Sequence, residues 1–440
     1  MVNARKLLTD IASFLAIVLM PWQARWIFAY HELAGERYEY GVFSVYAGSI
    51  IVIIAAAFLL YRLNFPKNFR PVYFWSVIAW LIISSLIAPS TSVAFFYSAL
   101  AIIAFGYFVI ASQWTQRKVM ISIVAAGMIQ AAFAWFQFII QKVSANTVLG
   151  VAEHLPHVLG QSVVLINGKR ILRAYALLPH PNILGGLLVV SFIVLVYFFI
   201  QSDRPSTIQH FRQRIMLIIS ALFLFSGILI TFSRAALLSV VVFLIGWVMY
   251  AGFRKNNQMI RKIGRITVYS GLLFLVFNLM ASNIWLDRFG VTFGSPTVSA
   301  GGGRLDALSN NERLGSYQQA QSLMNARSIF LGYGLGNYVP QLAQEFPSLP
   351  SYSYQPAHNV YVMMLLEFGV IGILLLLWIT ITVMRDRWYE CRGQVMYQYL
   401  FSIVIVLFFM GLFDHFLWTS YFGQSLWWLA LGLAANKSYS

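Results

Sequence analysis

The sequence is poor in charged residues and almost free of cysteine. Charged residues make up 10% of the 440 residues, whereas hydrophobic residues make up 60%. Soluble domains carry about 25% charged residues, so this composition excludes an ordinary soluble domain. The single cysteine, Cys391, excludes an internal disulfide framework.

Several motifs of nucleotide-using, hydrolytic and metal-dependent enzymes are also missing. The chain has no D-x-D pair, no Walker A loop, no G-x-S-x-G elbow and no clustered Cys/His metal site. Glu367 is the only carboxylate within a central apolar span, whereas divalent metals normally need several oxygen ligands. We therefore expect a site that uses no metal and no other cofactor.

What the sequence has instead is a series of long apolar runs. Several reach the roughly 20 residues that cross a bilayer as a helix, and they are continuously apolar rather than alternating, which disfavours a β-barrel. The runs predict twelve membrane spans, near 7–28, 42–61, 72–89, 93–112, 119–141, 183–200, 213–231, 235–252, 265–284, 359–384, 395–413 and 416–435. The predicted fold class is an all-α polytopic membrane protein.

The distribution of basic residues explains the net charge of +16. Lysine and arginine occur in every expected inner loop, whereas the short outer loops "APSTS" and "LFDHFLW" have none. This alternation follows the positive-inside rule. It predicts that both termini lie in the cytoplasm, and it accounts for the charge without a nucleic-acid partner.

Two expected outer segments, 142–182 and 285–358, are unusually long, as functional loops often are. The second contains "NERLGSYQQAQSLMNARSIFLG", which is typical of an amphipathic helix lying along the membrane surface. The following "GYGLGNY" provides glycine to end that helix. We therefore divide the chain into nine spans within 1–284, a long outer loop at 285–358, and three spans within 359–440.

The outer loop 142–182 ends in "RAYALLPHPN", which begins with Arg173. Pro179 and Pro181 favour an extended turn at His180, and Asn182 suits the N-cap of the next helix. The "HPN" stretch is thus either a capped helix start or part of a site. Arg173, a basic group near the outer interface, suits a lipid phosphate.

Further arginines lie on the same side. Arg234, in "TFSR", stands between two apolar runs with almost no loop, so it either faces a cavity or partner or extends to the outer head groups. In the long loop, Arg304 is expected to be solvated. Arg313 begins the expected surface helix, with Tyr317 and Gln321 on the same face.

His358 and Asn359 stand directly before the span 359–384. Either His358 is an incidental interfacial residue beside a capping Asn359, or it accepts a proton during catalysis. Asp414 and His415 lie on the same outer side, where an interfacial hydrogen bond also explains them. Because arginine binds phosphate oxygens bidentately, arginines with one histidine fit a diphosphate ligand and proton abstraction from a hydroxyl.

Four stretches, in their order along the chain, resemble the O-antigen ligase and polymerase superfamily of bacterial envelopes. They are "R-x(5)-P-H-P-N" at 173–182, "T-F-S-R" at 231–234, "R-L-G-S-Y…F-L-G-Y-G-L-G-N-Y" at 313–338 and "A-H-N-V-Y-V…E-F-G-V-I-G" at 357–372. The resemblance implies a GT-C-like fold in the bacterial inner membrane. It also implies transfer of a glycan from undecaprenyl diphosphate to the lipid A–core oligosaccharide on the periplasmic face, among membrane lipids.

The resemblance further implies a metal-independent, inverting reaction with His358 as the base on the acceptor hydroxyl. The arginines that would hold the diphosphate are Arg173, Arg313 and Arg234. Arg304 competes with Arg313 for the position of the family arginine. Possible supporting residues are His180, Asn182 and Asn359.

Two alternatives remain open at the level of sequence. A polymerase would bind the same donor and extend the carrier-linked glycan, and the motifs do not separate it from a ligase. A secondary transporter or lipid flippase would use arginines along a path, with charges at mid-membrane and broken helices in both halves. Here the distinctive basic residues gather on one face, which favours the enzyme.

Overall fold

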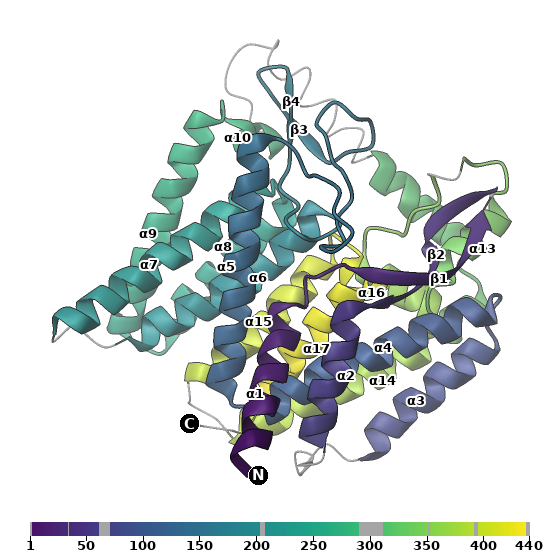
Figure 1. Ribbon diagram of the computed structural model, residues 1–440, viewed down its shortest axis with the longest axis horizontal. Coiled ribbons are helices and arrows are strands. Elements are labelled where there is room, and N and C mark those ends of the chain that lie inside the picture. Colours follow the sequence, from purple (N-terminus) through teal and green to yellow (C-terminus); the bar gives the residue numbers. More distant parts are fainter. Residues whose placement is uncertain are drawn as a thin grey trace. The chain divides into compact units, whose positions relative to one another are not determined.

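The computed structural model describes residues 2–33, 35–60, 71–202, 207–289, 311–350, 353–390 and 395–436. The described chain is mostly helical (Figure 1). It divides into two compact units. Unit 1 comprises Met1–Met20, Arg25–Val119 and Asn311–Ser440, whereas unit 2 comprises Pro21–Ala24 and Met120–Asn310.

The elements of unit 1 come from both ends of the chain. They are α1 (Val2–Val18), β1 (Arg25–Leu33), β2 (Glu36–Tyr46), α2 (Ala47–Leu60), α3 (Pro71–Leu86), α4 (Thr91–Gln113), a helix at 311–322, α12 (Ala326–Phe330), α13 (Tyr338–Glu345), α14 (Val360–Glu390), α15 (Val395–Gly411), α16 (Phe416–Thr419) and α17 (Tyr421–Ala435).

The elements of unit 2 come from the middle of the chain. They are α5 (Gln116–Ile140) from Met120 on, β3 (Val163–Ile166), β4 (Lys169–Leu172), α6 (Pro181–Gln201), α7 (Ile208–Ile230), α8 (Arg234–Phe253), α9 (Asn257–Met280) and α10 (Ile284–Arg288).

Seven helices within the described ranges are long and apolar enough to cross a membrane: α4, α5, α6, α7, α8, α9 and the part of α14 at Val360–Arg385. Shorter apolar helices lie at Ala47–Leu60, Trp75–Leu86 and Tyr397–Gly411. The prediction of a mostly helical, polytopic membrane protein is therefore confirmed. The count of twelve spans stays a prediction.

The all-α prediction is wrong in the first 46 residues. Helix α1 ends at Val18, and β1 and β2 form an antiparallel hairpin where the predicted spans 7–28 and 42–61 had their outer ends. Pro21 cannot continue the helix hydrogen bonds, and the aromatic and β-branched residues that follow favour strands. Arg25 holds the hairpin together through both carboxylate oxygens of Glu39, at 2.8 and 3.0 Å. A second hairpin, β3–β4, lies in the segment 142–182.

The last predicted span, 416–435, is also divided. Ser420 ends α16 and caps α17, because its Oγ accepts a hydrogen bond from the amide of Gly423 at 3.0 Å. A Cβ at Gly423 would lie 1.9 Å from the carbonyl oxygen of Phe416. The sharp turn between α16 and α17 therefore requires glycine at this position.

Helix α14 is interrupted at Gly369, whose φ of 67° and ψ of 171° are not helical. The glycine loop, residues 331–338, lies against this break. Its amides donate to two carbonyls beside the break, from Tyr333 to Leu366 at 2.7 Å and from Gly334 to Glu367 at 2.9 Å. In an apolar medium each carbonyl needs a partner within the protein, so the glycine loop is part of the structure of α14.

The Glu367 side chain strengthens the same junction. Its Oε1 accepts from the amide of Tyr338 at 3.2 Å, and its Oε2 accepts from Nε1 of Trp418 at 2.8 Å. Nε1 of Trp80 donates to the carbonyl of Phe368 at 3.1 Å. The carboxylate thus joins three parts of unit 1, which accounts for a buried acidic residue without a catalytic role.

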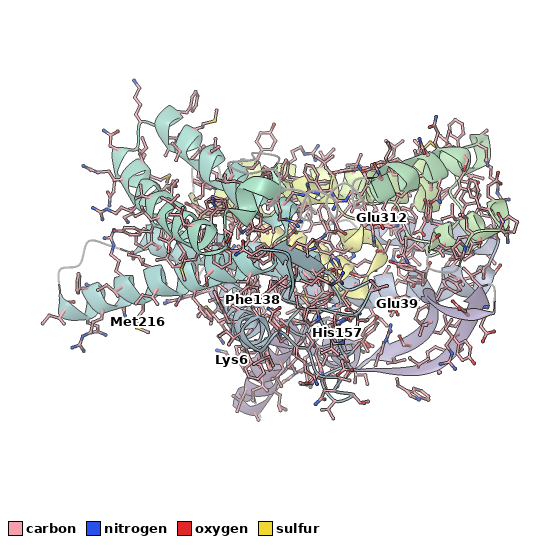
Figure 2. All side chains as sticks on the ribbon, turned by 90° about the horizontal axis from the view of Figure 1, so that it is seen from above. Lys6, Glu39, Phe138, His157, Met216 and Glu312 are labelled. Atoms are coloured by element: carbon pink, nitrogen blue, oxygen red, sulfur yellow. The ribbon has the colours of Figure 1, made fainter. Side chains whose placement is uncertain are left out.

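Helix α6 is the core of unit 2 and is buried along most of its length. Small residues let its neighbours approach closely, as in other membrane helix bundles. Oγ of Ser191 donates to the carbonyl of Ile123 on α5 at 3.0 Å, and a Cβ at Gly185 would lie 2.8 Å from Cβ of Ala236 on α8. On the outside of unit 2, Met216 of α7 extends away from the helices and is 67% exposed (Figure 2).

Candidate functional site

His358 lies in the turn directly before α14, and its neighbour Asn359 begins the helix. Oδ1 of Asn359 accepts from the amides of Tyr361 at 2.8 Å and Val362 at 3.2 Å, and its Nδ2 donates to the carbonyl of Leu412 at 3.3 Å. Asn359 is therefore the helix cap that sequence analysis considered. This cap fixes the start of α14 and with it the position of the preceding residue, His358.

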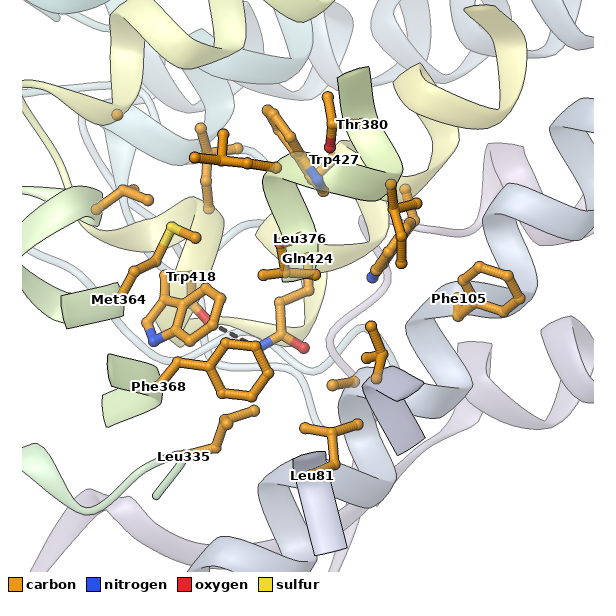
Figure 3. Close-up of a pocket in the computed structure, with 18 of the residues that line it drawn as sticks. Leu81, Phe105, Leu335, Met364, Phe368, Leu376, Thr380, Trp418, Gln424 and Trp427 are labelled. Carbon is orange, nitrogen blue, oxygen red and sulfur yellow. Dashed lines mark hydrogen bonds between the residues drawn. The ribbon is translucent and has the colours of Figure 1, made fainter. Parts of the chain in front are cut away.

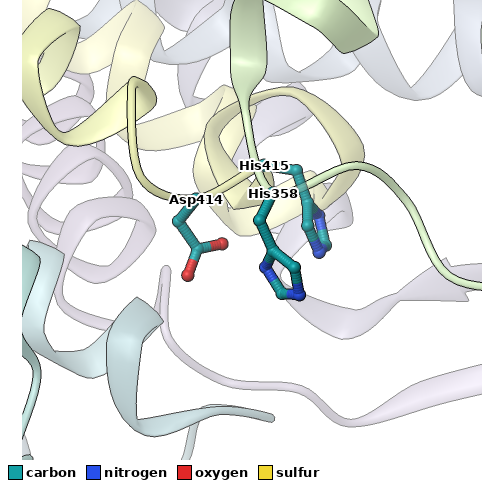
Figure 4. A group of neighbouring side chains, drawn as sticks. All are labelled: His358, Asp414 and His415. Atoms are coloured by element: carbon teal, nitrogen blue, oxygen red, sulfur yellow. The ribbon is translucent and has the colours of Figure 1, made fainter. Parts of the chain in front are cut away.

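Two residues from the α15–α16 turn complete a cluster with His358 (Figure 4). The ligand atoms of His358, Asp414 and His415 all lie within 4.8 Å of one another, and the two imidazole centroids are 5.3 Å apart. Sequence analysis saw Asp414 and His415 only as interfacial residues. One signal was available in the sequence. Asp414 and His415 follow the predicted span 395–413, and that span comes directly after the span 359–384, which begins next to His358.

Local hydrogen bonds fix the two residues from the turn. Asp414 is buried, and its Oδ1 accepts from the amide of Phe416 at 3.3 Å. Nδ1 of His415 pairs with Oγ1 of Thr419 at 2.7 Å. The ring of Tyr40, from β2, lies edge-on to His415 with centroids 6.4 Å apart. The cluster is thus held from both of its chain segments and from the hairpin.

Burial favours the neutral form of both imidazoles. It lowers the pKa of His358 below the ordinary value of 6.5, an effect that Asp414 opposes, Arg313 reinforces and Glu312 opposes. Burial likewise lowers the pKa of His415 to about 4, against the attraction of Asp414 and with the help of His358. A neutral ring can accept a proton, so His358 has the charge state that a general base needs.

The helix at 311–322 brings Arg313 near the same cluster. The hydroxyl of Tyr317, one turn after Arg313, donates to the carbonyl of His358 at 3.4 Å. Arg313 is half-buried and acts electrostatically on His358. Gln321, two turns after Arg313, is exposed. Arg304, the other candidate of this loop, lies outside the described residues.

Unit 2 holds a second cluster around Arg173. Its Nε donates to the carbonyl of Thr231 at 2.7 Å, and its Nη2 donates to Oδ1 of Asn182 at 2.6 Å. The amide of Ala174 also donates to the carbonyl of Ile230 at 3.1 Å. Arg173 therefore joins the "HPN" stretch to the "TFSR" turn, so two of the distinctive sequence stretches meet at one guanidinium group.

His180 occupies the cap position of α6. Its backbone is extended, with φ −151° and ψ 143°, as the flanking prolines predicted. Its Nδ1 accepts from the amide of Asn182 at 3.1 Å, and its Nε2 pairs with Oγ of Ser162 at 2.9 Å. The predicted cap at Asn182 is wrong, because Pro181 takes the first helical position and places Asn182 inside the helix.

Arg234 is the first residue of α8, after the capping Ser233. Its Nη1 donates to the carbonyl of Arg288, at the end of α10, at 3.3 Å. Arg234 thus has a protein partner, which is one of the two alternatives open from sequence. Phe232 has a positive φ of 48°, a strained conformation that costs roughly 1–3 kcal/mol and tends to be found at functional sites.

The contacts of Arg173 predict a positioning role that can be measured without a substrate. We expect Arg173→Ala to lower the melting temperature of the purified protein, since loss of a hydrogen bond to a charged group costs about 1.5–3 kcal/mol. Arg212→Ala, at an exposed position of α7, is the matched control and should leave the melting temperature unchanged. Equal melting temperatures for both variants would contradict the positioning role.

Unit 1 also has an open apolar cavity of about 120 Å³ among α3, α4, α14, α15 and the α16–α17 region (Figure 3). Aromatic and aliphatic side chains form most of its wall. Val360 and Tyr361, in the first turn of α14, belong to this wall, so the cavity begins two residues from His358 along the chain. The amide of Gln424, one of the few polar groups there, donates to the carbonyl of Trp418 at 2.6 Å. A cavity of this character suits a hydrocarbon chain.

Comparison with known proteins identifies part of the chain. A family model described as O-antigen ligase matches residues 219–377. The match includes Arg234, Arg313 and His358, but it ends before Asp414 and begins after Arg173. None of the curated proteins compared matches the chain.

Proposed function

We propose that this membrane protein, whose residues 219–377 match the O-antigen ligase family, transfers a glycan from undecaprenyl diphosphate to the lipid A–core oligosaccharide. The proposal places it in the bacterial inner membrane with about twelve spans in a GT-C-like fold. Both termini would lie in the cytoplasm and the site would face the periplasm. The observation that carries the proposal is the half-buried His358, whose ring nitrogen lies within 4.8 Å of a carboxylate oxygen of Asp414 and on which Arg313 acts electrostatically.

In the proposed reaction, His358 takes the proton from the acceptor hydroxyl as the hydroxyl oxygen attacks the anomeric carbon. The bond from that carbon to the diphosphate oxygen breaks, undecaprenyl diphosphate leaves with the electron pair, and the configuration at the carbon inverts. The imidazolium that forms is stabilised by the carboxylate of Asp414, which is already oriented by the amide of Phe416. The energy comes from the carrier's phosphate bond.

Arginines would stabilise the charge that develops on the departing diphosphate. A preorganised guanidinium group costs no reorganisation at the moment of reaction. Arg313, which acts electrostatically on His358, is the residue of unit 1 that we assign to this role. We extend the assignment to Arg173 and Arg234 on the resemblance of their sequence stretches, while their hydrogen bonds also give them local positioning roles.

The lipid carrier needs an apolar environment for its hydrocarbon chain. The cavity that begins at Val360 and Tyr361 offers one close to His358, which supports a membrane-embedded donor. Holding donor and acceptor together supplies much of the rate advantage of such a transfer.

Purified protein, carrier-linked oligosaccharide, lipid A–core acceptor and excess chelator provide the direct test. Labelled glycan on the acceptor would support a metal-independent ligase. A ladder of longer carrier-linked chains with the acceptor untouched would make the protein a polymerase with the same proposed base. Absence of transfer to any acceptor would contradict the enzyme and favour transport.

The lowered pKa of His358 predicts how kcat/KM for glycan transfer falls at acid pH. Only the neutral ring accepts a proton, so kcat/KM should rise with pH through the pKa of His358 and stay level above it. Because burial lowers this pKa, the midpoint should lie below 6.5, the ordinary value. Asp414→Asn should move the midpoint to still lower pH, since Asp414 raises the pKa.

The measurement is kcat/KM for glycan transfer from acid to mildly alkaline pH, for the wild type and Asp414→Asn. A midpoint above 6.5, or a midpoint that Asp414→Asn raises, would contradict the assignment of His358.

A further inference from the structure

The cluster beside α14 has the composition of a transition-metal site. Two imidazoles and one carboxylate contribute ligand atoms that all lie within 4.8 Å of one another, in residues His358, Asp414 and His415. Imidazole and carboxylate are common zinc ligands. The sequence predicts no such site, because one ligand precedes α14 and the other two follow α15.

The hydrogen bonds of the cluster leave suitable atoms for a metal. Nδ1 of His415 pairs with Oγ1 of Thr419 at 2.7 Å, which orients the ring and makes Nε2 the nitrogen that we assign to the metal. Within the described part of the chain, Nδ1 of His358 is buried with no hydrogen-bond partner. The carboxylate of Asp414, which comes from the same turn as His415, lies beside the ring of His358 (Figure 4).

Only small side-chain movements would bring these atoms to coordination distance. Zinc ligands lie about 2.0–2.2 Å from the metal, so ligand atoms in a tetrahedral site are about 3.3 Å apart. The present separations of up to 4.8 Å would therefore have to shorten by about 1.5 Å at most, through rotation about side-chain bonds of His358 and Asp414. The fourth position would remain for water, as in zinc sites with three protein ligands.

The charges around the cluster also favour a cation. Asp414 and Glu312 supply negative charge near His358, while Arg313 opposes it. The balance is therefore compatible with one divalent ion.

We propose that His358, Asp414 and His415 bind one zinc ion, and that zinc bound there inhibits glycan transfer. The inhibitory part rests on the proposed function, whereas binding of the ion does not. A neutral imidazole has one nitrogen with a lone pair and one that carries a proton. Once zinc occupies the lone pair of His358, neither nitrogen can accept the proton of the acceptor hydroxyl.

Zinc binding is measured first, by competition with a fluorescent zinc chelator, on the full-length protein in detergent after any polyhistidine tag has been removed. The wild type should bind one zinc ion. His415→Asn should weaken zinc binding at least about tenfold. The asparagine side chain can still form a hydrogen bond with Thr419, as Nδ1 of His415 does, but it has no atom in the place of Nε2. His157→Asn, at an exposed position outside the cluster, should bind zinc as the wild type does.

His358→Gln removes a ligand from the other chain segment and should also weaken zinc binding at least about tenfold. Unchanged affinity in either His415→Asn or His358→Gln, with melting temperatures equal to that of the wild type, would overturn the site. Should His415→Asn fail to fold, His358→Gln decides the question alone.

Inhibition is then tested in the transfer assay. Zinc should stop transfer by the wild type, a chelator should restore it, and His415→Asn should need at least about tenfold more zinc for the same inhibition. Zinc that binds without slowing transfer would overturn the inhibitory role. If the protein transfers no glycan at all, the proposed function fails, while the binding measurement still decides the metal site.

Discussion

His358→Gln is expected to slow glycan transfer by about 10²–10⁴-fold, the usual contribution of a general base. Glutamine keeps much of the volume of the side chain and can still form hydrogen bonds, but it cannot take a proton from the acceptor hydroxyl. The cap at Asn359 and the bond from Tyr317 involve groups other than the imidazole. The variant should therefore remain folded, with kcat lowered and donor binding largely kept.

His415→Asn is the matched control for this experiment, because it changes the neighbouring ring of the same cluster. Its kcat in the presence of chelator should match that of the wild type. Transfer rate and melting temperature are measured for both variants. Near-normal kcat in His358→Gln would remove the general-base hypothesis, and a large fall in its melting temperature would assign the loss of activity to folding instead.

Gly369→Ala is expected to destabilise unit 1 by about 3 kcal/mol, the upper part of the range for single substitutions. Two causes act together. The φ of 67° is costly for any residue with a Cβ. A Cβ at Gly369 would also lie 2.4 Å from the carbonyl oxygen of Phe330 and 2.7 Å from the carbonyl carbon of Leu331. Relief of this contact would move the glycine loop away from the break in α14.

Gly246→Ala provides the comparison, since no atom lies within 4 Å of a Cβ built at that helical position. It should stabilise the protein slightly or change the free energy of unfolding by less than about 1 kcal/mol. Thermal and denaturant unfolding in detergent measure both variants. Equal stability of the two would show that the contact between the glycine loop and α14 contributes little.

Hydropathy was sufficient to predict the helices in the middle of the chain. The predicted spans 183–200 and 235–252 correspond to α6 and α8 within two residues at each end. It failed at the first hairpin, because "RWIFAY" continues the apolar character of the preceding run. Mean apolarity cannot separate a membrane helix from an aromatic strand, and only the bonds between β1 and β2 decide between them.

The candidate site could be predicted one residue at a time but not as a set of contacts. His358 was recognisable because an ionisable ring before an apolar run is unusual. Its neighbours Asp414 and His415 come from the end of the following helix, and their approach depends on how α14 and α15 pack. Likewise, the sequence showed Arg173 and Asn182, but only the structure shows that one binds the other.

The division of α14 at Gly369 also bears on how the protein is made. The glycine loop precedes α14 in the chain. Its donor residues are therefore synthesised before the residues of α14 whose carbonyls accept their hydrogen bonds. The carbonyl groups beside the break in α14 can therefore form their hydrogen bonds without any contact from α15. The bond between Trp418 and Glu367 must form later, when the final helices arrive. The break in α14 therefore depends on two sets of contacts, one complete within residues 331–369 and one that needs the final helices.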